Sequence, residues 1–160
     1  QFNALGMLEA AIELGALSVD HLEATEPDSL TTLAQSKTMG VMLPCSGFHV
    51  DDRYGNGRAF IDANGALAIA TNVNPGSAPC LSMPMAIALA TRKLGITAAE
   101  SICASTINSA HLLGFNDLGT LDVGTQADLI MLRHSDERQL GYTFGGSHVE
   151  LVICNGAIVA

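Results

Sequence analysis

The chain has 160 residues, of which 48% are hydrophobic and 14% are charged, so it carries enough apolar material to build a core. Seven basic residues stand against sixteen acidic ones, and the resulting net charge of −9 repels phosphate backbones. This balance argues against nucleic acid as a partner. No apolar run is long enough to cross a membrane without a charge or a turn former, so we expect no membrane partner either.

The cysteine pattern disfavours two common kinds of chemistry. Cys45, Cys80, Cys103 and Cys154 contain no pair at the spacing of a CxxC motif, which argues against structural zinc and thioredoxin-type exchange. Four unpaired thiols in a mostly apolar chain are typical of a cytoplasmic protein. Cys45 lies at an expected strand end, where we interpret it as a small buried hydrophobe.

The first part of the chain alternates between helical and strand patterns. Apolar residues recur at helical spacing before Gly15, and a proline at position 27 suits the first turn of a second helix. Helices are therefore expected at about 5–14, 27–36 and 57–64, and strands at 17–20, 39–43 and 66–70. Strands that alternate with helices in this way pair in parallel through right-handed crossovers.

Polar residues follow each of these three expected strands. His21 follows the first, Cys45 the second and Asn72 the third. In α/β barrels the carboxyl ends of parallel strands carry the catalytic groups, so we expect the three side chains at one edge of the sheet. His49 falls in a segment, 46–52, that we expect to be an exposed loop.

The pattern changes in the last third of the chain. Helices are expected at about 82–94, 97–104 and 107–113, with Thr97 as a cap. A turn-rich β segment over 119–132 should pair with a hairpin over 149–159 that turns at Asn155-Gly156. These strands predict a small β domain.

Three local strings carry a resemblance to a known family. They are Val19-Asp20-His21-Leu22-Glu23, Asn74-Pro75-Gly76 and Gly146-Ser147-His148-Val149, and an LxVG and an ADL string lie between the last two. With these strings the chain resembles the amidohydrolase superfamily and, within it, the imidazolonepropionase family. The resemblance implies an α/β fold: residues 1–116 would form about strands 6–8 of a (β/α)8 barrel, and 117–160 part of a small β-sandwich. A whole barrel needs roughly 200 residues or more, so the chain is expected to be a C-terminal fragment.

The resemblance also implies an activity for the parent enzyme. It would be a metal-dependent hydrolase that opens the cyclic amide of 4-imidazolone-5-propanoate to N-formimidoyl-L-glutamate in histidine degradation. One zinc or iron ion would lower the pKa of its bound water. The partner is then a small-molecule substrate, a homodimer is left open, and the isolated fragment is expected to be inactive.

Site residues follow from the same resemblance, position by position. His21 would polarise the substrate or stabilise its oxyanion, and Asn72 would occupy the metal-ligand and proton-acceptor position after strand 8. The residues expected to contact substrate are Gln1, Asn74, Gly76 and Ser77. Asn72 departs from the family, which has aspartate there, and a neutral amide does not accept a proton near neutral pH.

The sequence leaves two alternatives open. The chain could come from a related deaminase or another cyclic amide hydrolase that shares the fold. It could also be a non-catalytic relic, as Asn72 suggests. Among the other candidates, Asp128 is expected to organise a turn, and His148 is expected either to anchor the β domain or to contact substrate.

Overall fold

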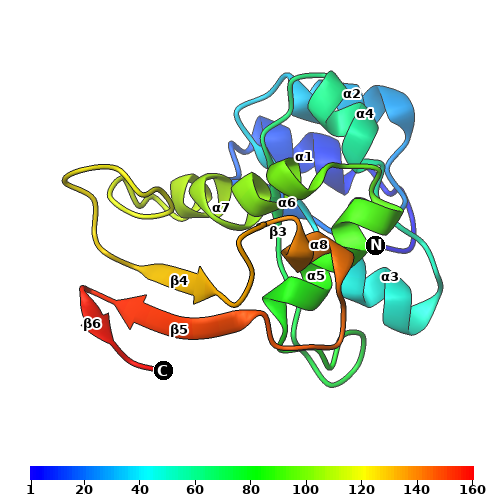
Figure 1. Cartoon of the computed structure of the whole chain (residues 1–160). Helices are drawn as coiled ribbons and strands as arrows, with labels where there is room; N and C mark the ends of the chain where they lie inside the picture. Colours follow the sequence, from blue (N-terminus) through cyan, green and yellow to red (C-terminus); the bar gives the residue numbers. More distant parts are fainter.

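The computed structural model describes residues 1–160 and contains two separate three-stranded sheets (Figure 1). The helices are α1 Met7–Glu13, α2 Pro27–Ala34, α3 Pro44–Val50, α4 Gly57–Asp62, α5 Met83–Lys93, α6 Ala98–Ser105, α7 Ile107–Leu112 and α8 Gln139–Tyr142. The strands are β1 Ser18–Asp20, β2 Met39–Met42, β3 Leu67–Ile69, β4 Leu129–Leu132, β5 Val149–Cys154 and β6 Ala157–Ile158. None of the helices is long and apolar enough to cross a bilayer.

The first sheet is parallel, with the strand order β1-β2-β3. Val19 pairs with Gly40, and Val41 pairs with Ala68. Every residue of β2 and β3 is buried, and several helices pack against these short apolar strands. The three predicted strands and their parallel order are therefore confirmed.

Close packing between α4 and the parallel sheet depends on glycine. The Phe60 ring of α4 is fully buried, and a Cβ built at Gly65 would lie 2.5 Å from its Cζ. A Cβ at Gly40 in β2 would lie 2.9 Å from the same atom. Two positions without side chains thus create the space that the Phe60 ring fills.

A side-chain network fixes the start of α6. The Thr97 hydroxyl accepts the Glu100 N–H at 3.2 Å, and the Glu100 carboxylate accepts the Thr97 N–H at 2.7 Å. Arg58 of α4 also donates to Glu100 at 2.9 Å, and the backbone bond from Thr97, followed by Arg58, lowers the pKa of Glu100. The predicted cap at Thr97 is confirmed as a complete capping box.

The second sheet is antiparallel, and in Figure 1 its strands lie beside the helices that cover the first sheet. Leu129 of β4 pairs with Ile153 of β5, and the hairpin turns at Asn155 and Gly156, where φ is 49° and 77°. Positive φ at both central residues is characteristic of a type I′ turn. The predicted hairpin is confirmed, and it pairs with the end of the expected 119–132 segment.

Three expectations about local structure were wrong. The β segment expected over 119–132 is a strand only from 129, because Gly119 and Gly124 take φ values of 85° and 96° that interrupt an extended chain. Residues 46–52 are not a loop: α3 runs to Val50, and Pro44 suits its first turn.

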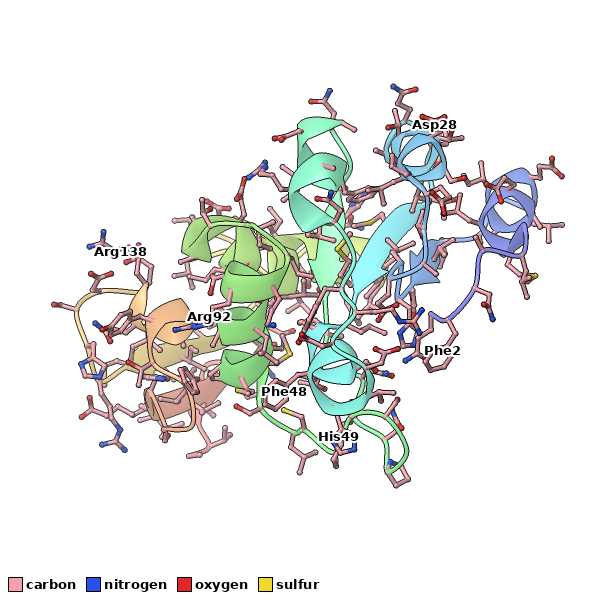
Figure 2. The ribbon with its side chains drawn as sticks, turned by 90° about the vertical axis from the view of Figure 1, so that its right-hand side faces the viewer. Phe2, Asp28, Phe48, His49, Arg92 and Arg138 are labelled. Atoms are coloured by element: carbon pink, nitrogen blue, oxygen red, sulfur yellow. The ribbon has the colours of Figure 1, made fainter.

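The third error concerns α8, a helix that the sequence did not predict. It packs against α5. Arg92 donates through Nη2 to the Tyr142 carbonyl at 2.7 Å, and Figure 2 shows Arg92 reaching from α5 toward α8. The Leu140 side chain joins the main hydrophobic core. The domain boundary expected between residues 116 and 117 falls in the segment between α7 and β4 and stays a prediction.

Candidate functional site

The parallel sheet brings three strand ends to one edge. Because β1, β2 and β3 run in the same direction and in register, the residues that follow their carboxyl ends share that edge. His21 follows β1, Cys45 follows β2 within α3, and Asn72 follows β3. This common edge was predicted from the sequence, and the strand pairing supports it.

His21 lies in an unusual stretch of backbone. His21 and Leu22 both have positive φ, 78° and 72°, a conformation that non-glycine residues rarely adopt. The resulting turn brings Nδ1 of His21 to 3.1 Å from Oε1 of Glu23. The Glu23 side chain is only 4% exposed, whereas that of His21 is 23% exposed. Sequence reasoning did not select Glu23 as a site residue, although it ends one of the strings that carried the resemblance.

Asn72 is held by a buried hydroxyl. Its Nδ2 donates to Oγ of Ser46 at 2.9 Å, and Ser46 is fully buried in the first turn of α3. Asn72 also has a positive φ of 55°, which asparagine tolerates better than most residues. Ser46 was missed because the sequence predicted a loop at its position.

The turn after β3 is held together by Asn74. Its Oδ1 accepts the N–H groups of Gly76 at 2.9 Å and Ser77 at 2.8 Å. Its Nδ2 donates to the carbonyl of Asn72 at 2.7 Å. The backbone N–H groups of Gly76 and Ser77 are therefore already paired with Asn74, and substrate contact by this turn stays a prediction.

Gln1 lines a cavity close to the end of β1. The cavity has a volume of about 160 Å³ and is also lined by Asp20 and Leu22, the two neighbours of His21 in the chain. The structure thus brings Gln1 near one of the expected catalytic positions. Its role as a substrate contact stays a prediction.

Cys45 has the character of a buried hydrophobe. Its side chain is 3% exposed, and burial, with a further contribution from Cys80, raises its pKa to about 12. A thiol with so high a pKa is not a nucleophile near neutral pH. It lines a second cavity of about 130 Å³ together with His49 and Cys80.

None of the other four histidines directly follows a strand of the parallel sheet. His49 is exposed on α3 beside Phe48 (Figure 2), and His111 and His134 are also exposed. His148 is buried, and its Nε2 lies 3.0 Å from the Thr143 carbonyl. That bond stays within one segment, so it supports neither of the two roles expected for His148.

The donor set of this chain does not make a complete metal site. No three His, Cys, Asp or Glu side chains converge anywhere in the structure, and Asn72 would supply only a neutral amide oxygen. Asp128 directly precedes β4, and its Oδ1 accepts the N–H of Asn155 in the hairpin turn at 2.6 Å. The turn-organising role expected for Asp128 agrees with this bond.

Comparisons with known proteins fit this arrangement. A sequence profile of the amidohydrolase family matches residues 2–159. The chain is 48% identical to an imidazolonepropionase of Herpetosiphon aurantiacus over 99% of its own length, and 43% identical over 98% to one of Deinococcus radiodurans. It spans only 38% and 39% of those two relatives.

A solved structure shares the fold. A zinc-bound adenosine deaminase from Xanthomonas campestris matches with a TM-score of 0.79 and 24% identity, over 94% of this chain and 39% of that one. Identity at this level supports the fold alone. Together with the sequence profile, it shows a mixed α/β architecture of the kind found in amidohydrolases.

Proposed function

This chain belongs to the amidohydrolase family, and we propose that it is the C-terminal part of an imidazolonepropionase. The proposed reaction is the hydrolytic opening of the cyclic amide of 4-imidazolone-5-propanoate to N-formimidoyl-L-glutamate, in histidine degradation. The observation that carries the proposal is 48% identity to an imidazolonepropionase over 99% of this chain. Because the chain spans 38% of that relative, the activity is proposed for the longer protein.

The architecture supports the same assignment. In the proposal, β1, β2 and β3 are about the sixth to eighth strands of a (β/α)8 barrel, and β4, β5 and β6 belong to a small β-sandwich. Parallel register and burial of the first sheet, and antiparallel pairing of the second, support this division. Barrel enzymes carry their catalytic residues at the carboxyl ends of the strands, where His21 and Asn72 lie.

His21 and residue 72 have separate proposed tasks. Ring opening places negative charge on the carbonyl oxygen, and the protonated imidazole ring of His21 can donate an N–H to that developing oxyanion. Position 72 is where the attacking water would lose its proton. The amide of Asn72 can orient water by hydrogen bonding, but it cannot take up that proton.

Substrate binding is proposed for the segments that flank these positions. Gln1 lines the cavity near the end of β1, and its amide offers both a donor and an acceptor. The turn with Asn74, Gly76 and Ser77 follows Asn72 directly, and its internal hydrogen bonds give it a defined shape. In the proposal Asn74 fixes the shape of the turn, and Gly76 and Ser77 on its outer surface contact the substrate.

A divalent ion is part of the proposal for the longer protein only. The related adenosine deaminase structure contains zinc, and zinc or iron would supply Lewis acidity for the ring carbonyl. The side chains of this chain do not fit such an ion on their own, since no three ligating groups converge. The ligands would therefore come mainly from the part of the longer protein that this chain does not span.

A second candidate has one specific observation in its favour. Asn72 removes the proton acceptor from the position where the family places aspartate, so the protein could be a non-catalytic relic. The two candidates share their fold and their strand-end geometry. An imidazolonepropionase should become active when residue 72 is acidic, whereas a non-catalytic relic should stay inactive.

Steady-state ring opening of 4-imidazolone-5-propanoate tests the proposal. The longer protein, with saturating zinc or iron, would be assayed by ultraviolet absorbance with Asn72 and with Asn72→Asp, and guanine, cytosine and adenosine would be the competing substrates. Turnover of the imidazolone by either form supports the proposal. Deamination of a competing substrate alone, or no turnover by either form, would overturn it.

We further propose a cytoplasmic location, which the four free cysteines favour.

A further inference from the structure

The Glu23 carboxylate is buried at a cost in stability that its hydrogen bonds do not offset. Its side chain is 4% exposed, and Oε2 is buried with no hydrogen-bond partner. The only side chain bonded to the carboxylate is His21, at 3.1 Å. An unpaired buried oxygen is destabilising, and a group retained at such a cost is a candidate for a role beyond stability.

The backbone conformation between His21 and Glu23 brings these two side chains together. His21 and Leu22 have φ values of 78° and 72°, a left-handed conformation that is strained in residues other than glycine. Leu22 is 4% exposed and belongs to the main hydrophobic core. Core packing of Leu22 therefore holds the strained turn in place and keeps Glu23 against His21.

We propose that Glu23 is a positioning residue for His21: its carboxylate accepts the hydrogen of Nδ1 and so turns Nε2 toward the substrate. In the neutral ring Nε2 then carries no hydrogen, and it donates to the oxyanion once the ring is protonated. An ionised carboxylate only accepts hydrogen bonds, so the nitrogen facing it must carry a hydrogen. The contact thereby selects one tautomer and one ring orientation, which is how carboxylates orient catalytic histidines elsewhere. The step to substrate rests on the proposed function, whereas the tautomer of His21 does not.

The tautomer is measured first, on this chain. Long-range 1H–15N correlation spectra of 15N-histidine-labelled protein at about pH 8, where an ordinary histidine is neutral, distinguish a hydrogen on Nδ1 from one on Nε2. His21→Asn assigns the signal, and exposed His49 gives the reference. We expect His21 to carry its hydrogen on Nδ1. A hydrogen mainly on Nε2 overturns the proposal without any further variant.

Glu23→Gln then tests the carboxylate. The amide has nearly the same shape but can also donate, so the His21 tautomer population should shift toward that of His49. The matched control is Glu13→Gln, which makes the same chemical change at an exposed site in α1. A purely structural role for Glu23 would change the unfolding midpoint and leave the tautomer of the folded protein unchanged, and that result overturns the proposal.

Activity separates this inference from the proposed function. In the longer protein with Asn72→Asp, Glu23→Gln should lower kcat by about 10-fold or more, as loss of a carboxylate that orients a metal-bound histidine does elsewhere, with little change in KM. Ring opening with an unchanged kcat overturns the role of Glu23 and leaves the function standing. No ring opening by any form, with the expected tautomer in the spectra, overturns the function and leaves the positioning of His21 standing.

Discussion

The Ser46 hydroxyl and the Asn72 amide form a hydrogen bond of 2.9 Å between segments that are 26 residues apart in the chain. Ser46 is fully buried at the start of α3, and Asn72 follows β3. A hydroxyl can accept from an amide and can equally donate to a carboxylate. Ser46 is therefore suited to hold either Asn72 or an aspartate at the same position.

Ser46→Ala should destabilise the chain through this bond. The expected loss is about 1 kcal/mol in the free energy of unfolding, the usual contribution of one such hydrogen bond. Urea unfolding of Ser46→Ala, Asn72→Ala and the double variant gives the coupling energy of the pair. Additive losses, with no coupling, would mean that the bond does not contribute to stability.

Asn72→Asp should raise ring opening in the longer protein. Loss of a general base typically lowers the reaction rate on the order of 10²–10⁴-fold. Restoring the carboxylate should therefore raise the rate of ring opening by a factor in that range. Steady-state rates of the two forms, side by side with saturating metal, measure it. The double variant with Ser46→Ala and Asn72→Asp is the control, because it removes the hydroxyl that orients the side chain of residue 72. Equal rates with asparagine and aspartate would show that residue 72 is not the proton acceptor.

Cys45 should resist alkylation in the folded chain. Burial raises its pKa to about 12, so its thiolate is scarce at about pH 8, where ordinary thiols react readily. Cys103 and Cys154 are exposed and should be modified by iodoacetamide first. Mass spectrometry after timed labelling, native and in denaturant, gives the order. The prediction fails if native Cys45 reacts as fast as Cys154.

Gly65→Ala should destabilise the packing of α4 on the parallel sheet. The added Cβ would lie 2.5 Å from the Phe60 ring, and overpacking of this kind costs about 1–3 kcal/mol. Gly146→Ala is the matched control, since a Cβ there meets nothing within 4 Å and φ is not positive. Thermal unfolding of both variants checks the difference. A Gly65→Ala midpoint no lower than that of Gly146→Ala would contradict the packing argument.

Local patterns in the sequence were sufficient for much of the fold. The three parallel strands, the cap at Thr97 and the turn at Asn155-Gly156 were predicted because each depends on residues close together in the chain. Strand order then placed His21 and Asn72 at one edge. The two missed helices, α3 and α8, are short, and periodicity is a weak signal over so few residues.

The contacts that define the candidate site required the folded chain. A sequence does not reveal that Ser46 is buried beside Asn72, because that pairing depends on how α3 and β3 pack. Glu23 follows His21 by two residues, yet only the left-handed backbone at His21 and Leu22 turns the two side chains together. Burial and long-range packing decide such contacts, and neither is a property of a short stretch of sequence.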